Sequence, residues 1–337
     1  MDICVLGAQV PFVRGGAEIH MDNLVDACIA AGHRAELVRL PTVWDRERIF
    51  EAALAWRMVP LDCDLVICIN FPSYFVQHPR KVVWLAHQHR GAYDGAGGPW
   101  SDFGLDDDGL ELQRLLSEWD TRALSEAEGL FCTSGVVADR LARYNGLVAE
   151  PVYHPAPLFD RLHPGPFGDS VFCPSRLEGN KRPGLIVEAL EHVRSDARVA
   201  LAGRGSLHDE LVATAARLGV SPRLDLLGFV SDDDLVEHFA NALAVIYAPF
   251  DEDYGYVTLQ AFRAGKPVIT ASDSGGVLEW VEDGVNGFVT DGSPAGIAEA
   301  IDRLASDRAL AEKMGAAGRE RVAGLAWGPV VDRLIAP

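Results

Sequence analysis

Short, continuous runs of hydrophobic residues alternate along the chain with segments in which hydrophobic positions recur at helical spacing. Residues 3–7 form a hydrophobic run of strand length, and residues 17–31 follow with hydrophobic side chains three or four positions apart. Gly32 is expected to end that helix. Continuous apolar strands separated by helices are typical of parallel sheets covered on both faces, so the first half predicts a doubly wound α/β domain. Its other predicted strands are residues 35–40, 65–69, 82–86 and 129–133.

A proline-rich segment, residues 152–168, interrupts this alternation and has the composition of a linker. The same pattern then restarts, which predicts a second domain of the same class. Ligands of open parallel sheets bind outside the carboxyl ends of the strands, so two such domains can face each other across one interdomain cleft. The strands predicted after the break are 171–173, 199–202, 224–227, 244–247 and 267–270, and the helices are 185–193, 207–218, 232–240, 257–264, 277–281, 294–306 and 309–323.

Length and composition agree with two globular domains. A chain of 337 residues exceeds one ordinary core, and 48% hydrophobic with 23% charged residues is a globular composition. We expect domains at residues 1–155 and 165–321. No hydrophobic run is long enough to span a bilayer, and the N-terminus lacks the basic region of a signal peptide. Six scattered cysteines without paired spacing are interpreted as reduced thiols of a cytoplasmic protein.

The net charge of -19 argues against nucleic acid and anionic membranes as partners. A local basic patch would be compatible with that charge, so a weak peripheral membrane contact stays open. Three acidic clusters, residues 62–64, 106–108 and 232–234, superficially resemble metal sites. We interpret them as solvated faces or helix caps and expect no metal site. The segment 91–108 lacks a periodic pattern and is expected to be either a lid or a mobile surface excursion.

The strongest chemical signal is the segment 252–261, which follows a predicted strand and opens a helix. Gly255 has no Cβ, so the backbone can approach a ligand closely there. The N–H groups of the first helical turn favour an anion. An acidic residue before the loop and a hydrogen-bonding residue one turn inside the helix suit a sugar and a ribose on either side of a diphosphate. The predicted contact residues are Glu252, Asp253, Tyr254, Gly255, Tyr256, Val257 and Gln260.

This segment resembles the E-x7-E region of retaining GT-B glycosyltransferases of family 4. Residues 265–269, 275–279 and 284–288, and residues 15–20 after the first strand, are similar to that family in order and spacing, so the resemblance covers nearly the whole chain. It implies two Rossmann-like domains, with the C-terminal tail of about residues 322–337 packing back on the first. It also implies metal-independent transfer of a hexose-type sugar from a UDP- or GDP-sugar, without a cofactor, to a hydroxyl of a glycan, glycolipid or small natural product.

The resemblance assigns roles to four residues. Arg176 and Lys181 match the basic pair that grips the donor diphosphate, and cations there neutralise charge on the leaving phosphate in place of a metal. His87 matches a histidine that contacts the donor sugar, with a structural histidine as the alternative. Glu252 would orient sugar hydroxyls. Arg182 is a third cationic candidate, but we expect it to be a surface residue.

Weaker candidates lie in loops that follow three other predicted strands. A Gly-Gly pair before the first helix suits a phosphate or acceptor hydroxyls, and a Gly-Arg-Gly loop resembles the nucleotide-side loop of the family. Main chain after a further strand could line the base pocket. Each of these could equally be an ordinary turn. The residues are Gly15, Gly16, Gly203, Arg204, Phe229 and Val230.

One departure from the family keeps a second function open. Gln260 stands where the family has its second glutamate, which pairs with ribose hydroxyls. Glutamine still donates and accepts hydrogen bonds but loses the charge-assisted part, about 1 kcal/mol per bond. A sugar-nucleotide-binding regulator with degraded catalysis is therefore the alternative. An NAD-dependent oxidoreductase is a further alternative, although the chain lacks the full G-x-G-x-x-G fingerprint.

Overall fold

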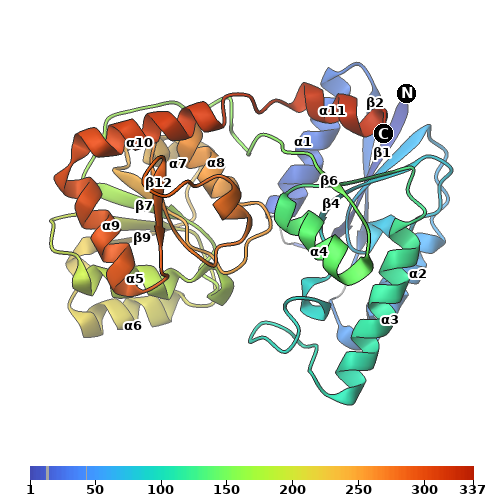
Figure 1. Ribbon diagram of the computed structural model, residues 1–337, viewed down its shortest axis with the longest axis horizontal. Helices are drawn as coiled ribbons and strands as arrows, with labels where there is room; N and C mark the ends of the chain where they lie inside the picture. The colour runs from blue at the N-terminus through green and yellow to red at the C-terminus, as the bar shows by residue number, and fades with distance from the viewer. Residues whose placement is uncertain (13–14, 43) are drawn as a thin grey trace. The chain divides into compact units, whose positions relative to one another are not determined.

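The structure is a computed structural model of the chain and describes residues 1–12, 15–42 and 44–337. The chain forms two compact units. The first unit comprises Met1–His154 together with Ala326–Pro337, and the second comprises Pro155–Leu325. Both units have the predicted α/β architecture, a parallel sheet with helices on its two faces (Figure 1).

The first unit is built on a parallel sheet with the strand order β2-β1-β3-β4-β5-β6 among the described residues. β1 pairs with both β2 and β3, so the strand order reverses beside it. The strands are β1 (Asp2–Gln9), β2 (Arg34–Pro41), β3 (Leu65–Asn70), β4 (Lys81–His87), β5 (Gly129–Cys132) and β6 (Glu150–Pro151). The helices are α1 (Gly16–Ala30), α2 (Ile49–Arg57), α3 (Asp107–Leu124), α4 (Gly135–Asn145) and α11 (Trp327–Ile335).

Two hydrophobic clusters cover the two faces of this sheet. One contains buried side chains of α1 and α11, such as Leu24 and Leu334, and the other contains buried side chains of α2, α3 and α4, such as Trp56 and Leu141. The C-terminal helix α11 is therefore part of the first core. Trp327 lies 5.4 Å from His154 and 6.2 Å from Trp84 between ring centroids.

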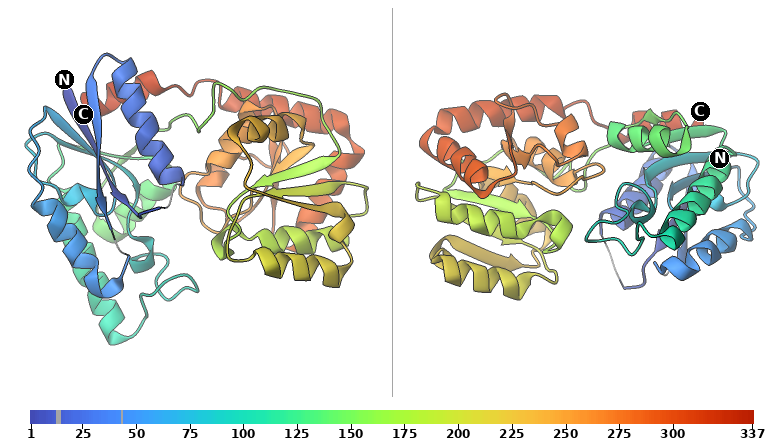
Figure 2. Two further views of the ribbon diagram at one scale, coloured as in Figure 1. Left: turned by 180° about the vertical axis from the view of Figure 1, so that it is seen from behind. Right: turned by 60° about the horizontal axis from the view of Figure 1, so that its bottom comes forward.

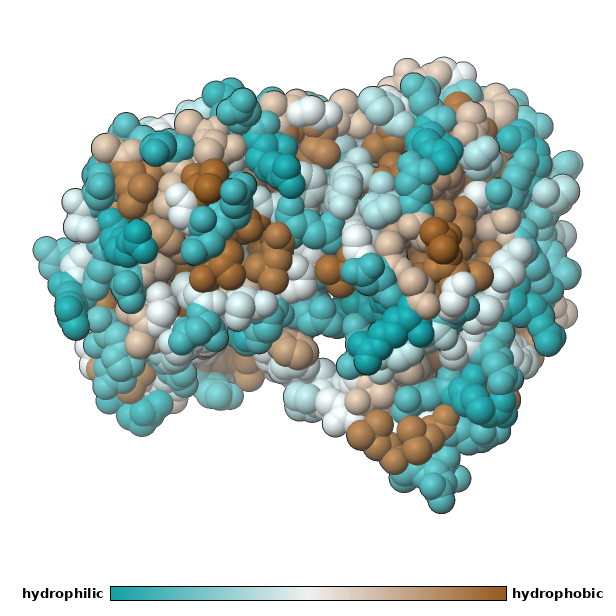
Figure 3. Space-filling view, viewed as in Figure 1, coloured by the Kyte–Doolittle hydropathy of each residue, from teal (hydrophilic) through white to brown (hydrophobic). Residues whose placement is uncertain are grey.

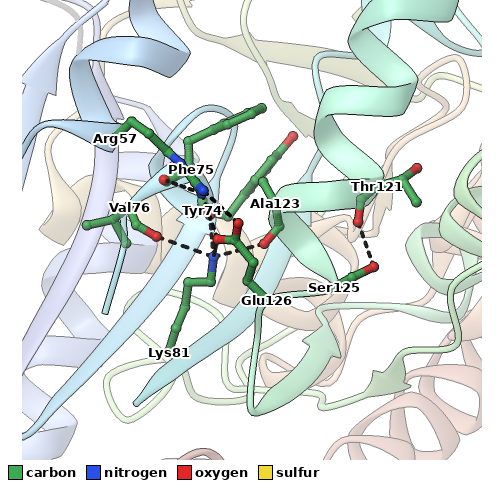
Figure 4. Close-up of polar contacts among 9 residues, drawn as sticks. All are labelled: Arg57, Tyr74, Phe75, Val76, Lys81, Thr121, Ala123, Ser125 and Glu126. Atoms are coloured by element: carbon green, nitrogen blue, oxygen red, sulfur yellow. Dashed lines mark hydrogen bonds and ion pairs between the residues drawn. The ribbon is translucent and has the colours of Figure 1, made fainter. Parts of the chain in front are cut away.

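A buried ammonium group is bound by residues of the second of these clusters. The Lys81 side chain is 1% exposed, and the three N–H groups of its Nζ face four acceptors at 2.8 to 3.3 Å (Figure 4). Full pairing offsets the cost of burying the charge. The acceptors are the backbone oxygens of Tyr74, Val76 and Ala123 and the carboxylate of Glu126, which also forms an ion pair with Arg57.

The second unit repeats the architecture with the strand order β12-β11-β10-β7-β8-β9 among the described residues. β7 pairs in parallel with β8 and β10 at the centre of the sheet. The strands are β7 (Ser170–Pro174), β8 (Arg198–Ala202), β9 (Leu224–Gly228), β10 (Ala244–Ile246), β11 (Val268–Ala271) and β12 (Gly287–Thr290). The helices are α5 (Pro183–His192), α6 (His208–Leu218), α7 (Asp232–Asn241), α8 (Tyr256–Arg263), α9 (Pro294–Ser306) and α10 (Arg308–Arg321).

The layers of the second unit can be followed in Figure 2. One hydrophobic cluster joins the sheet to α5, α6 and α9, and another joins it to α7 and α8. The proline-rich segment predicted as a linker contributes Phe159 and Leu162 to the second of these clusters. Arg263 of α8 also donates to the backbone oxygen of Phe159 at 3.0 Å. Much of this segment is therefore packed structure of the second unit.

Several elements differ from the sequence predictions. The helix expected at residues 277–281 is wrong, because the segment forms one short 3-10 turn, Gly276–Glu279. Three helices of the first unit, α2, α3 and α4, were not predicted. The segment expected to be patternless as far as residue 108 becomes helical at Asp107, and Phe103 within it is fully buried.

The visible surface is largely hydrophilic, with apolar side chains in separate areas (Figure 3). The described part of the chain contains no helix with the length and hydropathy needed to cross a bilayer.

Candidate functional site

Three loops meet at the carboxyl edge of the second sheet, where parallel α/β sheets bind ligands. The loop after β10 runs beside the loop after β11, with an isolated parallel bridge between Glu252 and Gly275. The backbone N–H of Asp251 donates to Asp273 O at 2.9 Å, and that of Gly276 donates to Glu252 O at 2.7 Å. These bonds fix the backbone that carries Glu252.

The carboxylate of Glu252 accepts hydrogen bonds from two neighbours. Lys181, in the 3-10 turn Gly179–Lys181 after β7, forms an ion pair with it, and Tyr247 donates its hydroxyl at 2.9 Å. The ammonium also lies 3.4 Å from the Tyr247 hydroxyl. The Lys181 and Glu252 side chains are 13% and 21% exposed, so the pair is shielded but reachable. We refer to these three residues as the Lys–Glu–Tyr cluster.

Tyr247 acts in this cluster as a neutral hydrogen-bond donor. Burial raises its pKa well above the usual value, and the neighbouring Glu252 carboxylate raises it further, whereas the positive charge of Arg176 opposes the shift. Arg176 therefore lies within electrostatic range of the cluster. The structure brings together Lys181 and Glu252, which the sequence singled out, and it adds Tyr247, which the sequence analysis missed.

The start of α8 lies next to Glu252 in the chain. Gly255 is the N-cap residue, with φ 85°, and a Cβ there would lie 2.8 Å from a methyl group of Val277, so glycine is required. The first-turn residues Tyr256 and Val257 present their N–H groups at this end of the helix. Tyr254 is buried against Tyr256 and Trp280 in edge-to-face contacts, and Asp253 precedes it in the loop. This packing fixes the direction of the helix start.

The side chain of Gln260, one turn into α8, is hydrogen-bonded to the proline-rich segment. Its side-chain amide donates to the backbone oxygen of Pro157 at 3.0 Å, and the residue is 7% exposed. A carboxylate could not donate this bond. The glutamine that replaces the family's second glutamate therefore has a structural partner within the second unit.

Main-chain hydrogen bonds also join the loops after β7, β8 and β9. Gly203 donates its N–H to Gly228 O at 2.7 Å, and a Cβ on Gly203 would lie 1.9 Å from Ser175 O, so no larger residue fits. The guanidinium of Arg204 lies over the exposed ring of Phe229, 5.8 Å from its centroid. Val230 packs on the hydrophobic cluster beneath.

Arg182 corrects the sequence interpretation, which treated it as a surface residue. Its side chain is only 20% exposed, and it forms a two-pronged ion pair with Asp273 as well as hydrogen bonds to two backbone carbonyls. Arg182 is the N-cap residue of α5 and follows Lys181 directly in the chain. Its partners in other loops could not be seen in the local sequence.

The remaining candidates belong to the first unit. His87 ends β4 and donates its Nδ1–H to Gln88 O at 2.9 Å. Gly15 is the N-cap of α1, which begins at Gly16, and the Gly15 N–H donates to the Glu18 carboxylate at 2.8 Å. Glu18 thus caps the helix start at which a phosphate or acceptor hydroxyls were expected.

The acidic clusters have structural partners. Asp64 accepts the backbone N–H of Asp2, and Asp106 is the N-cap of α3. Asp232, Asp233 and Asp234 occupy the first turn of α7, whose N-cap is Ser231. Within residues 1–12, 15–42 and 44–337, no group of three or more His, Cys, Asp or Glu side chains is arranged to hold a metal ion.

Comparison with known proteins finds similarity over most of the second unit. Residues 169–321 match the family model described as Glycosyl transferases group 1. A GDP-mannose-dependent alpha-(1-6)-phosphatidylinositol monomannoside mannosyltransferase of Mycobacterium tuberculosis is 36% identical over 179 residues, which are 49% of this chain and 46% of that protein. The chain spans between 34% and 53% of the length of the first curated relatives that it matches.

Solved structures match over nearly the whole chain. The Alr3699/HepE protein of Anabaena, solved with UDP-glucose, is 18% identical with a TM-score of 0.74, covering 99% of this chain and 98% of that one. A sucrose-phosphate synthase of Thermosynechococcus elongatus is 17% identical with a TM-score of 0.80, covering 99% and 98%. At this identity the likeness concerns the fold. Residues 169–321 thus match the glycosyl transferases group 1 family model, and the chain as a whole has the GT-B fold.

Proposed function

We propose that this chain is a retaining glycosyltransferase that moves a hexose-type sugar from a UDP- or GDP-sugar to a hydroxyl acceptor without a metal or other cofactor. The observation that carries the proposal is the Lys–Glu–Tyr cluster beside the start of α8, at the carboxyl edge of the second sheet. The family match of residues 169–321 and the mannosyltransferase relative support it.

The donor diphosphate would bind between the cations and the helix start. Lys181 and Arg176 supply positive charge, and the first-turn N–H groups after Gly255 supply oriented dipoles, so that charge on the departing diphosphate is stabilised without a divalent ion. Because Lys181 is already paired with Glu252, an incoming phosphate competes for its ammonium. The Glu252 carboxylate then becomes available to accept hydrogen bonds from the sugar hydroxyls.

The acceptor would bind through the first unit. The helix start at Gly15 and Gly16 is what we assign to the acceptor, whereas His87, at the end of β4, is assigned to the donor sugar. In the retaining reaction the acceptor oxygen attacks the anomeric carbon from the face that the diphosphate leaves. A phosphate oxygen takes the hydroxyl proton as the bond from the anomeric carbon to the diphosphate breaks. No protein base is assigned to this step.

A ligand-induced shift in melting temperature tests donor binding. The purified chain is heated with UDP, GDP, ADP and TDP, and with their sugar conjugates, in the presence and absence of EDTA. A bound nucleotide at 100-fold its dissociation constant stabilises the protein by about 2.7 kcal/mol. We expect one base to be preferred, and EDTA to leave both binding and donor hydrolysis unchanged. Absence of a shift with every nucleotide would contradict the proposal.

Charge-matched variants localise the site. Lys181→Ala is expected to weaken diphosphate binding by roughly tenfold, about 1.4 kcal/mol, because one charge-assisted contact is lost. Lys313→Ala removes the same charge from an exposed position on α10 and should leave binding within about twofold. Equal effects of the two variants would show that general charge, and not this site, governs binding.

The second candidate function is a sugar-nucleotide-binding protein without turnover. The buried hydrogen bond from Gln260 to Pro157 favours it, because this side chain is already engaged within the second unit. Slow release of free sugar from the preferred donor distinguishes the two functions. Binding without any donor hydrolysis, with a panel of hydroxyl acceptors present, would favour the binding protein.

A further inference from the structure

The guanidinium of Arg182 joins the loops that carry the Lys–Glu–Tyr cluster. It reaches from the start of α5 to the loop after β10 and to the loop after β11. An ideal Cβ on Gly292, in the loop after β12, would lie 3.9 Å from its Nη1. The four hydrogen bonds are Nε to Ala248 O at 2.8 Å, Nη2 to Pro249 O at 2.9 Å, Nη1 to Asp273 Oδ2 at 2.9 Å and Nη2 to Asp273 Oδ1 at 2.7 Å.

The backbone of Arg182 is held in an uncommon conformation. Its φ is 50° and its ψ is 46°, in the left-handed region, although it is not a glycine. Pro183 follows and disfavours the right-handed alternative. A left-handed residue persists only where its surroundings over-determine it. The side-chain bonds of Arg182 supply that constraint and, through the shared peptide, fix the direction of Lys181.

We propose that Arg182 is a positioning residue of the donor site. Its guanidinium fastens the turn that bears Lys181 to the loop that bears Glu252, so that ammonium and carboxylate are in place before the diphosphate arrives. A second backbone bond supports the same junction, since the N–H of Phe250 donates to Asn180 O at 2.8 Å. The inference rests on the proposed function and adds a residue that acts through Lys181 without touching the donor.

The role calls for arginine in particular. A planar guanidinium directs its N–H groups along fixed axes, so one side chain can hold two adjacent carbonyls and a carboxylate at once. A lysine ammonium in the same place would keep the charge but could not span all three acceptors. We therefore expect Arg182→Lys to behave like Arg182→Ala in binding, while it stays closer to the wild type in thermal stability.

The same domain offers a matched control. Arg198, at the opposite end of the sheet where β8 begins, pairs with Asp225 through Nη2 at 2.8 Å and donates to Pro222 O at 2.8 Å. It therefore has the same kinds of partner as Arg182 but is remote from the carboxyl edge. Arg198→Ala measures what the loss of such an arginine does to the second unit as a whole.

The experiment measures the dissociation constants of UDP and GDP by calorimetry, alongside the melting temperature without ligand. Arg182→Ala should raise the dissociation constant of the preferred nucleotide by roughly tenfold, and Arg198→Ala by less than about twofold. The double variant Lys181→Ala/Arg182→Ala tests whether Arg182 acts through Lys181. If Arg182 acts through Lys181, adding Arg182→Ala to Lys181→Ala should raise the dissociation constant by less than about threefold.

Three outcomes would overturn the inference, and the first differs from the other two in what it refutes. If the wild type binds neither nucleotide, the proposed function fails and the inference fails with it. If the wild type binds and Arg182→Ala binds equally well, or if the two single effects multiply in the double variant, only the positioning role is refuted. If Arg182→Ala yields little folded protein, Arg182→Lys replaces it in the binding comparison, because lysine keeps the aliphatic part of the side chain and the positive charge.

Discussion

A buried carboxyl group in the first unit should make its stability depend on pH in an unusual direction. Asp120 is fully buried on α3, and its carboxylate accepts a hydrogen bond from the Tyr93 hydroxyl. Burial raises its pKa from 3.8 to about 7, although the hydrogen bond from Tyr93 acts against the shift. The native state therefore holds a proton that the unfolded state has released between about pH 4 and pH 7.

The sign and size of the effect follow from linkage. Where the folded state binds the extra proton, stability falls as pH rises, by about 1.4 kcal/mol per pH unit. The Asp120 contribution is complete below pH 4 and is lost through pH 7, a total of roughly 4 kcal/mol. Asp120→Asn keeps the shape and an acceptor oxygen but cannot ionise. We expect the asparagine variant to gain roughly 4 kcal/mol relative to the wild type between pH 4 and pH 8.

Urea unfolding, monitored by tryptophan fluorescence, measures this difference in unfolding free energy for the first unit of the protein. Six of the seven tryptophans lie in the first unit, and only Trp280 lies in the second. Groups that titrate equally in both proteins cancel in the comparison. Asp139 is an exposed aspartate on α4, and Asp139→Asn is the control. Its unfolding free energy should differ from that of the wild type by a nearly constant amount across this pH range. Parallel stability curves for wild type and Asp120→Asn across this pH range would refute the reasoning.

Three further predictions use the same kind of measurement. Lys81→Met leaves four acceptors without their buried ammonium and should cost the first unit about 3–5 kcal/mol in urea unfolding, whereas the exposed Lys313→Met should stay within about 0.5 kcal/mol. Burial lowers the pKa of His20 from 6.5 to about 3, so stability is present above pH 6.5 and is lost on acidification. The difference in unfolding free energy between wild type and His20→Gln, measured by fluorescence-detected urea unfolding, should fall by roughly 2 kcal/mol from pH 7 to pH 5, since the Asp120 contribution is common to both proteins. An unchanged difference would contradict this assignment. Gly203→Ala should destabilise the second unit by about 3 kcal/mol or more in calorimetry, while Gly324→Ala, which meets open space, should have little effect; similar melting shifts for the two would disprove the steric argument.

The fold was predictable wherever burial was continuous. β3 is buried at every position, and β11 likewise, so their hydrophobic runs appear directly in the sequence. α3 escaped prediction because its surface positions are charged and paired, as Arg114 is with Glu111 and Glu118. Its buried face also includes Asp120, which breaks the hydrophobic pattern. Where a polar residue replaces an apolar one in the core, periodicity cannot reveal the helix.

The sequence motif of the site could be predicted, but the residues that hold the motif in place could not. Glu252, Gly255 and Lys181 could be named because each follows a strand in a recognisable order. The partners that hold them are defined by contacts between distant segments, such as Arg182 with Asp273, 91 positions apart. Tyr247 ends a run of apolar residues and looks like core until the neighbouring loop places a carboxylate against its hydroxyl. Such partners depend on tertiary packing, which local patterns do not encode.

The arrangement of the C-terminal helix has a consequence for synthesis on the ribosome. The second unit is one uninterrupted segment, Pro155–Leu325, whereas the first unit needs α11 to cover its sheet (Figure 1). Trp84 and Leu24 therefore lack part of their hydrophobic cover until residues 327–335 have left the exit tunnel. The second unit is translated later than most of the first, but all of its residues are available for folding earlier. A nascent chain stalled before residue 327 should thus expose apolar surface on the earlier-made unit, where chaperones bind.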